Sequence, residues 1–168
     1  MRDPHLYPAM SPRALLLLPV AMMPSLVASL GGSLATAMGL QSWYPTLVKP
    51  FFNPPDVVFP LVWTFLFALM AIAFWRILRL KPEAGARGRA IGLFLLQMAL
   101  NLGWSYAFFG LRSPLAGLLV IGALIIAIAL TIRAFRPLDR ASAFALYPYL
   151  AWVGFAALLN AAIFVLNR

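Results

Sequence analysis

The side chains that could do chemistry in this sequence are aromatic rings and carboxamides rather than ionisable groups. One set lies in the uncharged stretch 90–111, at spacings of four, four and three residues with an indole on the same side: Gln97, Asn101, Ser105, Phe108 and Trp104. Spacings of three and four place side chains on one face of an α-helix. This face would therefore carry two carboxamides, a hydroxyl and two rings along a single stripe.

Two further stripes of the same kind occur elsewhere in the chain: Tyr149, Trp152, Ala156 and Asn160 in one, and Phe59, Trp63 and Phe67 in the other. The small Ala156 leaves room beside the indole of Trp152. Three such faces turned inward would line a flat apolar pocket with a few hydrogen-bonding points. Alternatively, the carboxamides hydrogen-bond neighbouring helices, at about 0.6–2 kcal/mol each, with no ligand involved. The pattern leaves both interpretations open.

Ionisable groups are scarce, and none lies in the middle of an apolar stretch. The chain has no Cys, its one His is His5, and its acids are far apart, at Asp3, Asp56, Glu83 and Asp139. Charged groups inside spans normally mark proton relays and ion pathways, so we expect neither a proton-coupled transporter nor a charge-lined channel. No carboxylate pair, phosphate-binding loop or nucleophile elbow is present. We therefore predict no conventional catalytic set, no metal site and no required cofactor.

The elements that position these stripes are predicted to be membrane-spanning helices. Of 168 residues, 64% are apolar and 10% charged, with a mean hydropathy of +0.93, which excludes an ordinary soluble domain. A span needs about 20 apolar residues. We predict an all-α integral membrane bundle of five transmembrane helices in one domain, residues 1–168, with spans at about 14–38, 57–79, 89–111, 114–134 and 141–166.

Local signals suggest how these spans begin and bend. Ser113 and Pro114 offer an N-cap followed by proline at the first helical position, and Asp56 is expected to cap the second span. Pro148 lies inside the fifth span, where it removes a hydrogen bond to the Phe144 carbonyl and should kink the helix. The first span could instead be a signal peptide cleaved near residues 35–37, but its apolar stretch is longer than a usual signal core, which favours a retained helix.

Basic residues are distributed unevenly between the two sides of the predicted bundle. Ten lie on the side of the N-terminus: Arg2, Arg13, Arg76, Arg79, Lys81, Arg87, Arg89, Arg133, Arg136 and Arg140. Only Lys49, Arg112 and Arg168 lie on the other. The positive-inside rule then predicts a cytoplasmic N-terminus and an outside C-terminus. This asymmetry and anionic headgroups account for the net charge of +9, so nucleic acid is not an expected partner.

Short strings between about residues 42 and 160 occur in an order and at spacings that resemble one known family. They are Trp43-Tyr44, Lys49-Pro50, Asn53-Pro54-Pro55, Phe59-Pro60-Leu61-Val62-Trp63-Thr64, Gln97, Asn101, Trp104, Phe108-Phe109-Gly110, Tyr147-Pro148-Tyr149-Leu150-Ala151-Trp152, Phe155-Ala156 and Asn160. Together they resemble the TspO family of tryptophan-rich sensory proteins, which includes the mitochondrial translocator protein (the peripheral-type benzodiazepine receptor). The first forty residues match only in character.

This resemblance implies a five-helix bundle, often a homodimer, that binds porphyrin or haem and aromatic drug-like ligands in a pocket closed by the first loop, here about residues 39–56. Gly88 and Gly92 have the spacing of a small-residue dimer face. The resemblance also implies a link to tetrapyrrole metabolism and oxidative stress. Phe59 is added to the residues that the resemblance implies, because it lies on the same stripe as Trp63. The expected ligand-binding residues are then Tyr44, Phe59, Trp63, Asn101, Trp104, Trp152, Ala156 and Asn160.

Two departures from the family pattern are visible. The motif before the proline pair usually contains tryptophan, whereas this chain has Phe51-Phe52, which retains ring area but lacks the indole N–H donor. The animal cholesterol motif needs a tyrosine followed by a base near the C-terminus. The segment after Asn160 reads Ala161-Ala162-Ile163-Phe164, so cholesterol recognition is not predicted.

Our leading hypothesis from the sequence is a membrane receptor or carrier for a flat tetrapyrrole. Rings of Trp63, Trp104 and Trp152 would stack on it, at about 0.5–1.5 kcal/mol per aromatic pair beyond area burial. Asn101 and Asn160 would orient it through hydrogen bonds. Moving its propionates into the apolar interior would cost free energy because they are charged, so we expect them to point outward to Lys49 or Arg112.

Two alternatives belong to other functional classes. One is light- and oxygen-dependent porphyrin degradation with Trp63 and Trp152 as redox-active rings, an activity that the resemblance associates with some bacterial relatives. Radical chemistry of this kind needs no acid–base pair. The other is a non-catalytic membrane scaffold that modulates a signalling partner.

Overall fold

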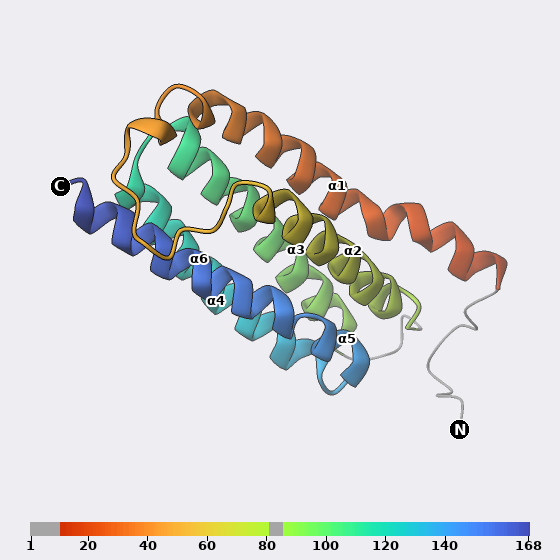
Figure 1. Ribbon diagram of the computed structural model, residues 1–168. Helices are drawn as coiled ribbons and strands as arrows, with labels where there is room; N and C mark the ends of the chain where they lie inside the picture. Colours follow the sequence, from red (N-terminus) through yellow and green to blue (C-terminus); the bar gives the residue numbers. More distant parts are fainter. Residues whose placement is uncertain (1–10, 81–85) are drawn as a thin grey trace.

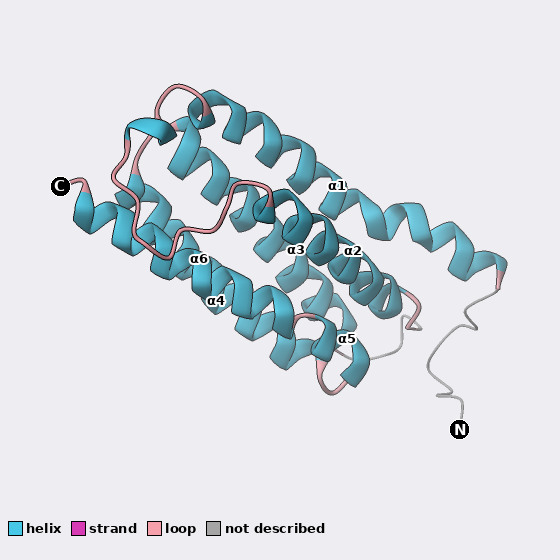
Figure 2. Ribbon diagram, viewed as in Figure 1, coloured by secondary structure: helices cyan, strands magenta, loops and turns pink. Residues whose placement is uncertain are grey.

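The computed structural model describes residues 11–80 and 86–168, which form a bundle of helices joined by loops (Figures 1 and 2). Five ionisable residues named above lie outside the described residues: Arg2, Asp3, His5, Lys81 and Glu83. The elements in order are α1 (Pro12–Leu40), a 3-10 turn η1 (Tyr44–Thr46), α2 (Val58–Leu78), α3 (Arg87–Ser105), a π-helical turn η2 (Tyr106–Gly110), α4 (Pro114–Phe135), α5 (Arg140–Ala145) and α6 (Tyr147–Leu166).

Five helical stretches in the described part of the chain are long and apolar enough to cross a membrane. They are Pro12–Leu40, Val58–Leu78, Arg87–Gly110, Pro114–Phe135 and Arg140–Leu166. The prediction of an all-α bundle with five transmembrane helices is therefore confirmed. No bound of these stretches differs from its predicted position by more than two residues.

The start of α4 is capped as predicted, but the start of α2 is not. The Ser113 hydroxyl accepts a hydrogen bond from the Ala116 amide at 3.2 Å, and Pro114 is the first residue of α4. The prediction that Asp56 caps α2 is wrong, because Val57 takes the cap position and no side chain bonds there. The Val58 amide instead donates to the Pro55 carbonyl at 2.9 Å. The Val58 amide is therefore hydrogen-bonded to the backbone and needs no bond from a capping side chain.

The last membrane-spanning stretch is interrupted beside its proline. Pro148 lies inside the stretch Arg140–Leu166, as predicted, and regular helix is interrupted just before it, because α5 ends at Ala145 and α6 begins at Tyr147 with Pro148 in its first turn. In that position the missing proline N–H costs nothing, because the first amides of a helix have no intrahelical partner. The Leu146 amide bonds back to the Ala143 carbonyl at 3.2 Å and closes the end of α5.

Small residues let α1 lie close to the rest of the bundle. It packs against α2, α3 and η2, and the residues that it buries are all small: Ala14, Ala21, Ser25, Ala28, Gly32, Ala35 and Gly39. A Cβ atom on Gly39 would lie 2.6 Å from the Phe109 carbonyl oxygen. Glycine is therefore required where α1 meets η2.

Large rings fill the core near the other end of the bundle. Phe74 of α2 and Phe94 of α3 stack at 4.2 Å between ring centroids with an interplanar angle of 7°, and Phe135 of α4 stacks on Phe94 at 6.1 Å. All three rings are buried. They hold the ends of α2, α3 and α4 together by dispersion and stacking, away from the residues predicted to bind a ligand.

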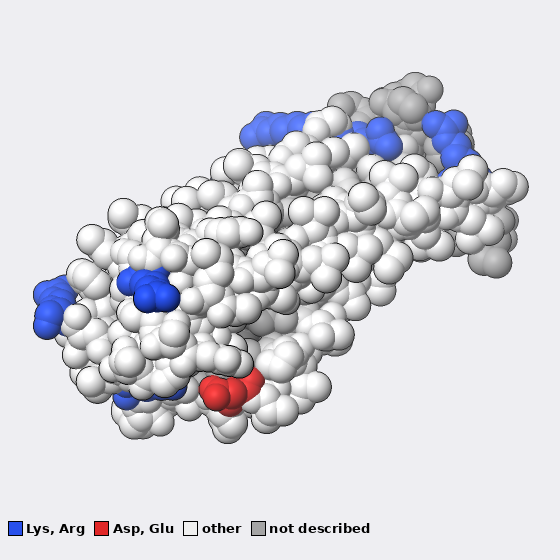
Figure 3. All heavy atoms as spheres, turned by 90° about the horizontal axis from the view of Figure 1, so that it is seen from above, with Lys and Arg blue, Asp and Glu red and all other residues white. Residues whose placement is uncertain are grey.

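The alternating helix directions place most basic residues at one end of the bundle. α1 and α3 begin at that end, and α2 and α4 finish there (Figure 1). It carries eight described arginines: Arg13, Arg76, Arg79, Arg87, Arg89, Arg133, Arg136 and Arg140. The other end carries Lys49, Arg112 and Arg168. On the face shown in Figure 3, basic side chains lie toward the two ends and an uncharged band separates them.

Candidate functional site

A layer of aromatic rings separates α2 from α6. Close backbone packing joins α1 to α2 and α4 to α6, whereas the contacts from α2 to α6 described here run through large side chains. The Phe59 and Trp152 rings are 5.9 Å apart at 70°, and the Trp63 and Tyr149 rings are 6.3 Å apart at 65°. We call these four residues the ring wall. Phe67 extends it along α2, stacked on Trp63 at 5.4 Å.

The indole N–H of Trp152 is a buried donor without a hydrogen-bond partner among the described residues. Its ring also contacts Phe155 at 5.5 Å, and the small Ala156 lies one turn further along α6. An unsatisfied buried donor costs about 1–3 kcal/mol. Gln97 of α3 is fully buried with neither amide atom paired. Unpaired polar groups of this kind call for a partner that the described residues do not supply.

The two predicted asparagines, in contrast, are already paired across helices. The Asn101 amide of α3 donates to the Tyr149 hydroxyl of α6 at 3.0 Å. Asn160 of α6 accepts from the Trp104 indole at 3.2 Å and donates to the Pro114 carbonyl at 2.7 Å. Both carboxamides therefore join helices, as the alternative interpretation of the stripes predicted. In doing so they fix the orientations of two rings.

A second aromatic group lies at the loop end of the bundle. We call Tyr44, Trp104, Phe108 and Phe109 the lid cluster. Trp104 stacks on Phe108 at 5.7 Å and 22°, and Tyr44 lies 6.3 Å from Phe108 and 5.7 Å from Phe109. The predicted stripe of α3 is confirmed as far as Ser105, since Gln97, Asn101 and Ser105 are all buried.

The π-helical turn η2 explains how two consecutive phenylalanines both point inward. The Leu111 amide bonds to the Tyr106 carbonyl, five residues back, at 2.8 Å. This wider turn buries Phe108 and Phe109 together, whereas regular α-helical spacing would turn one of them away. Single π-helical turns frequently occur at functional sites. Sequence spacing alone gave no signal for it.

The loop between α1 and α2 is held down at its start by Tyr44. The phenol donates to the Asn53 side-chain oxygen at 3.1 Å. Burial, followed by the negative charge of Asp56, raises the pKa of Tyr44 despite this hydrogen bond, so the phenol remains protonated and continues to donate. Of the two phenylalanines that replace the family's tryptophan, only Phe52 contacts the helices, through Phe155 at 6.4 Å, while Phe51 is fully exposed.

The middle of the same loop is fastened to the end of α6. The Val48 amide donates to the Asn167 side-chain oxygen at 2.9 Å, and the Asn167 amide donates to the Val48 carbonyl at 3.0 Å. Figure 1 shows this loop passing across the end of α6 before α2 begins. Asn167 was not predicted from the sequence, where its only signal is that a polar residue directly follows an apolar span.

The two cations predicted to meet propionates lie at the loop end, close to the lid cluster rather than to the ring wall. The Lys49 ammonium lies 4.2 Å from the centre of the Tyr44 ring. The Arg112 guanidinium donates to the Ser42 hydroxyl at 3.4 Å. Arg112 occupies the turn between η2 and α4 with a φ angle of 51°.

The predicted site residues thus form two neighbouring groups. Phe59, Trp63 and Trp152 meet in the ring wall, Tyr44 and Trp104 in the lid cluster, and Asn101 and Asn160 pair with rings of each. Two surface hollows in the described part of the chain are lined by none of these residues. Among the described residues, no group of three His, Cys, Asp or Glu side chains could hold a metal.

Comparison with known proteins identifies the family to which the chain belongs. A sequence model described as the TspO/MBR family matches residues 16–166. The chain is 44% identical to the tryptophan-rich protein TspO of Chlorobaculum tepidum, covering 84% of this chain and 90% of that protein. It is 37% identical to the tryptophan-rich sensory protein of Cereibacter sphaeroides, over 70% and 72%, and 35% identical to the human translocator protein, over 82% and 81%. The chain therefore belongs to the TspO/MBR family and is a multi-pass integral membrane protein.

Proposed function

We propose that this protein is a membrane receptor or carrier for porphyrin or haem and related flat aromatic molecules, with a sensory or regulatory role in tetrapyrrole and oxidative-stress metabolism. The observation that carries the proposal is the buried, unpaired indole N–H of Trp152 within the ring wall. A planar ligand with polar atoms would satisfy this donor while stacking on the neighbouring rings. The printed names of the relatives, "sensory protein" and "translocator protein", are compatible with this role.

In this proposal Asn101 and Asn160 orient aromatic rings and do not themselves make the main contacts with the ligand. Asn101 holds Tyr149 and Asn160 holds Trp104, so the rings are pre-oriented before a ligand arrives. The rings of Phe59 and Trp152 contact each other edge to face. A ligand entering between α2 and α6 would replace such contacts by face-to-face ones of similar energy, about 0.5–1.5 kcal/mol per pair.

The loop from residue 41 to 57 would act as the lid of this site. Tyr44 packs on the lid cluster and Asn167 fastens Val48. The Lys49 ammonium lies over the Tyr44 ring, at the loop end of the bundle. In this position it would form an ion pair with a propionate at the ligand edge that faces the loop. Arg112, in the turn between η2 and α4, would form an ion pair with the second propionate.

A tryptophan-fluorescence titration of purified protein with protoporphyrin, haem and cholesterol tests the proposal. Trp152→Phe keeps the ring and removes the N–H, so we expect protoporphyrin to bind roughly 2- to 13-fold more weakly, corresponding to one hydrogen bond of about 0.5–1.5 kcal/mol. Trp75→Phe is the matched control, because that indole is already paired with the Ala14 carbonyl at 2.8 Å. Equal effects of both substitutions, or no saturable binding by the wild type, would contradict the proposal.

A second candidate function uses the same rings for light- and oxygen-dependent porphyrin degradation. It is favoured by the contact between Trp63 and the buried Tyr149, and by the position of Trp152 in the same wall. Illuminated protein should then convert protoporphyrin into a new pigment, which Trp63→Phe and Trp152→Phe variants should fail to form. Equal bleaching by all three proteins would assign the loss to free photosensitised oxygen.

A further inference from the structure

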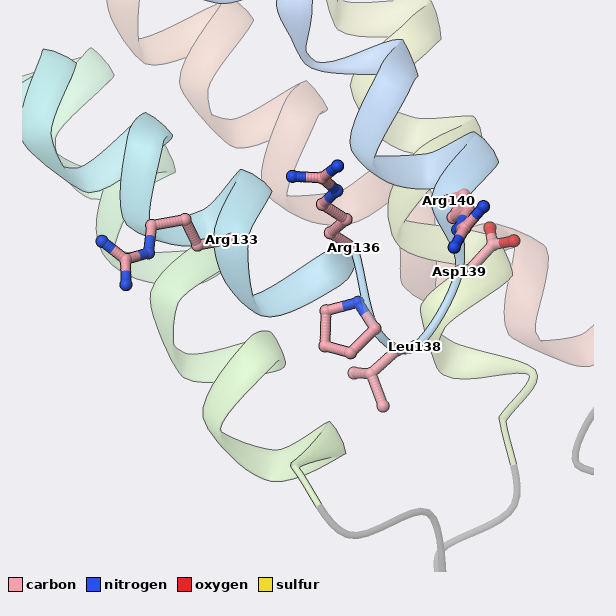
Figure 4. A pocket seen from close by; sticks show the side chains of 6 residues that line it. Arg133, Arg136, Leu138, Asp139 and Arg140 are labelled. Carbon is pink, nitrogen blue, oxygen red and sulfur yellow. The ribbon is translucent and has the colours of Figure 1, made fainter.

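A hollow lined by arginines lies at the basic end of the bundle and includes none of the ring-wall or lid-cluster residues. It has a volume of about 580 Å³ and is lined by Arg133, Arg136, Pro137, Leu138, Asp139 and Arg140. Figure 4 shows that these residues come from the last turn of α4, the following loop and the start of α5. A smaller hollow of about 150 Å³ shares two of the arginines and is lined by Arg136, Arg140, Ala143, Phe144 and Tyr147.

The one acidic residue in the larger hollow does not neutralise these arginines. Both carboxylate oxygens of Asp139 accept hydrogen bonds from Arg76 of α2, at 2.7 and 2.8 Å. Within the described residues, Arg133, Arg136 and Arg140 make no hydrogen bond or ion pair, and all three are exposed. All three positive charges lie around one hollow, so each of them attracts an anion bound there. Guanidinium groups bind phosphate through paired hydrogen bonds.

The second hollow adds an apolar side to the same arginines. Phe144 is 68% exposed and Tyr147 is 46% exposed, although both lie in the membrane-spanning stretch Arg140–Leu166. Their rings contact each other at 5.8 Å. Arg136 and Arg140 therefore stand between a polar hollow and an apolar surface. A free phosphate ion would use only the first of these features, whereas a phospholipid would use both.

We propose that the paired hollows bind an anionic phospholipid of the leaflet at this end of the bundle. Arg133, Arg136 and Arg140 hold its phosphate-bearing headgroup, and its acyl chains run along Phe144 and Tyr147. This site is separate from the proposed tetrapyrrole site and does not depend on it. It would tie the α4–α5 connection to the membrane surface, beside the ion pair that joins this connection to α2.

Native mass spectrometry of the purified full chain in neutral detergent tests this proposal by counting bound phosphatidylglycerol. We expect R136Q/R140Q to bind it about 30-fold more weakly than the wild type. Each basic residue near an anionic surface contributes about 1 kcal/mol, and 1.4 kcal/mol is a tenfold change in affinity. R89Q/R168Q is the matched control, because it also removes two exposed positive charges, and neither residue lines either of these two hollows. We expect it to bind like the wild type.

Four further measurements decide the source of the anion and guard against misfolding. Phosphatidylcholine should bind weakly to all variants, and inorganic phosphate should not displace phosphatidylglycerol. R136K/R140K retains both charges and should recover part of the binding lost in R136Q/R140Q, while Phe144→Ala should weaken lipid binding. The proposal is overturned if R89Q/R168Q loses as much affinity as R136Q/R140Q, if R136K/R140K binds no better than R136Q/R140Q, or if phosphate displaces the lipid.

Discussion

Replacing Asp139 by Asn is expected to remove an acid-sensitive part of this protein's stability. Burial alone would favour the neutral carboxyl, but hydrogen bonds from Arg76 and Ser142 outweigh it and lower the pKa of Asp139 from 3.8 to about 2. Because the pKa is lower in the folded state, the carboxylate stabilises the fold above about pH 4. This contribution is lost as the pH falls from there toward about 2.

The size of the effect follows from the ion pair and its exposure. A decrease in pKa from 3.8 to about 2 corresponds to roughly 2 kcal/mol. The Arg76 side chain is 34% exposed and that of Asp139 is 11% exposed, so solvent screens part of the attraction. We expect a loss of about 1–2 kcal/mol near neutral pH in Asp139→Asn. Asn is also a good N-cap, so the cap on the Ser142 amide is kept.

The assay is equilibrium unfolding in mixed micelles, followed by circular dichroism from neutral pH down to about pH 2. The stability difference between wild type and Asp139→Asn should shrink to near zero at the acid end. Asp139→Ala should lose about 1 kcal/mol more, because it also removes the cap. A double-mutant cycle with Arg76→Gln should return a coupling of about 1–2 kcal/mol. If the wild type and Asp139→Asn curves stay parallel throughout, the Arg76 pairing does not set the Asp139 pKa.

Two further predictions concern the candidate ligand site. A Cβ atom at Gly117 would lie 2.7 Å from the Asn160 side-chain oxygen and 3.0 Å from the Phe108 ring, so Gly117→Ala should cost about 1–3 kcal/mol in thermal unfolding. Gly122→Ala in the same helix, with nothing within 4 Å, should be neutral or stabilising by up to about 1 kcal/mol; similar losses for both would refute the packing argument. The double substitution Lys49→Ala with Arg112→Ala should weaken protoporphyrin binding at low salt by roughly 2- to 30-fold, from 0.2–1 kcal/mol per exposed charge pair. Binding of the uncharged dimethyl ester should be unaffected, and an equal loss for the ester would contradict the propionate assignment.

The sequence by itself determined the five membrane-spanning stretches, the ends of these stretches within two residues, and the separation of basic residues between the two ends of the bundle. These features are local: a span is a run of apolar residues of bilayer length, and a cap such as Ser113 acts within one turn. The prediction that failed, the cap at Asp56, also has a local cause. The Val58 amide bonds to the Pro55 carbonyl, three residues back, so α2 begins without a bond from the aspartate.

Only the tertiary structure decided which polar groups meet and which stay unpaired. Spacing placed Asn101 and Asn160 on inward faces, but their partners Tyr149, Trp104 and the Pro114 carbonyl come from other helices. The same holds for the unpaired Trp152 N–H. It also holds for the arginine hollow, whose one carboxylate, Asp139, is paired with Arg76 of α2. Pairing depends on the distance in space between atoms that are far apart in the chain. The spacing of residues within one helix does not predict this distance.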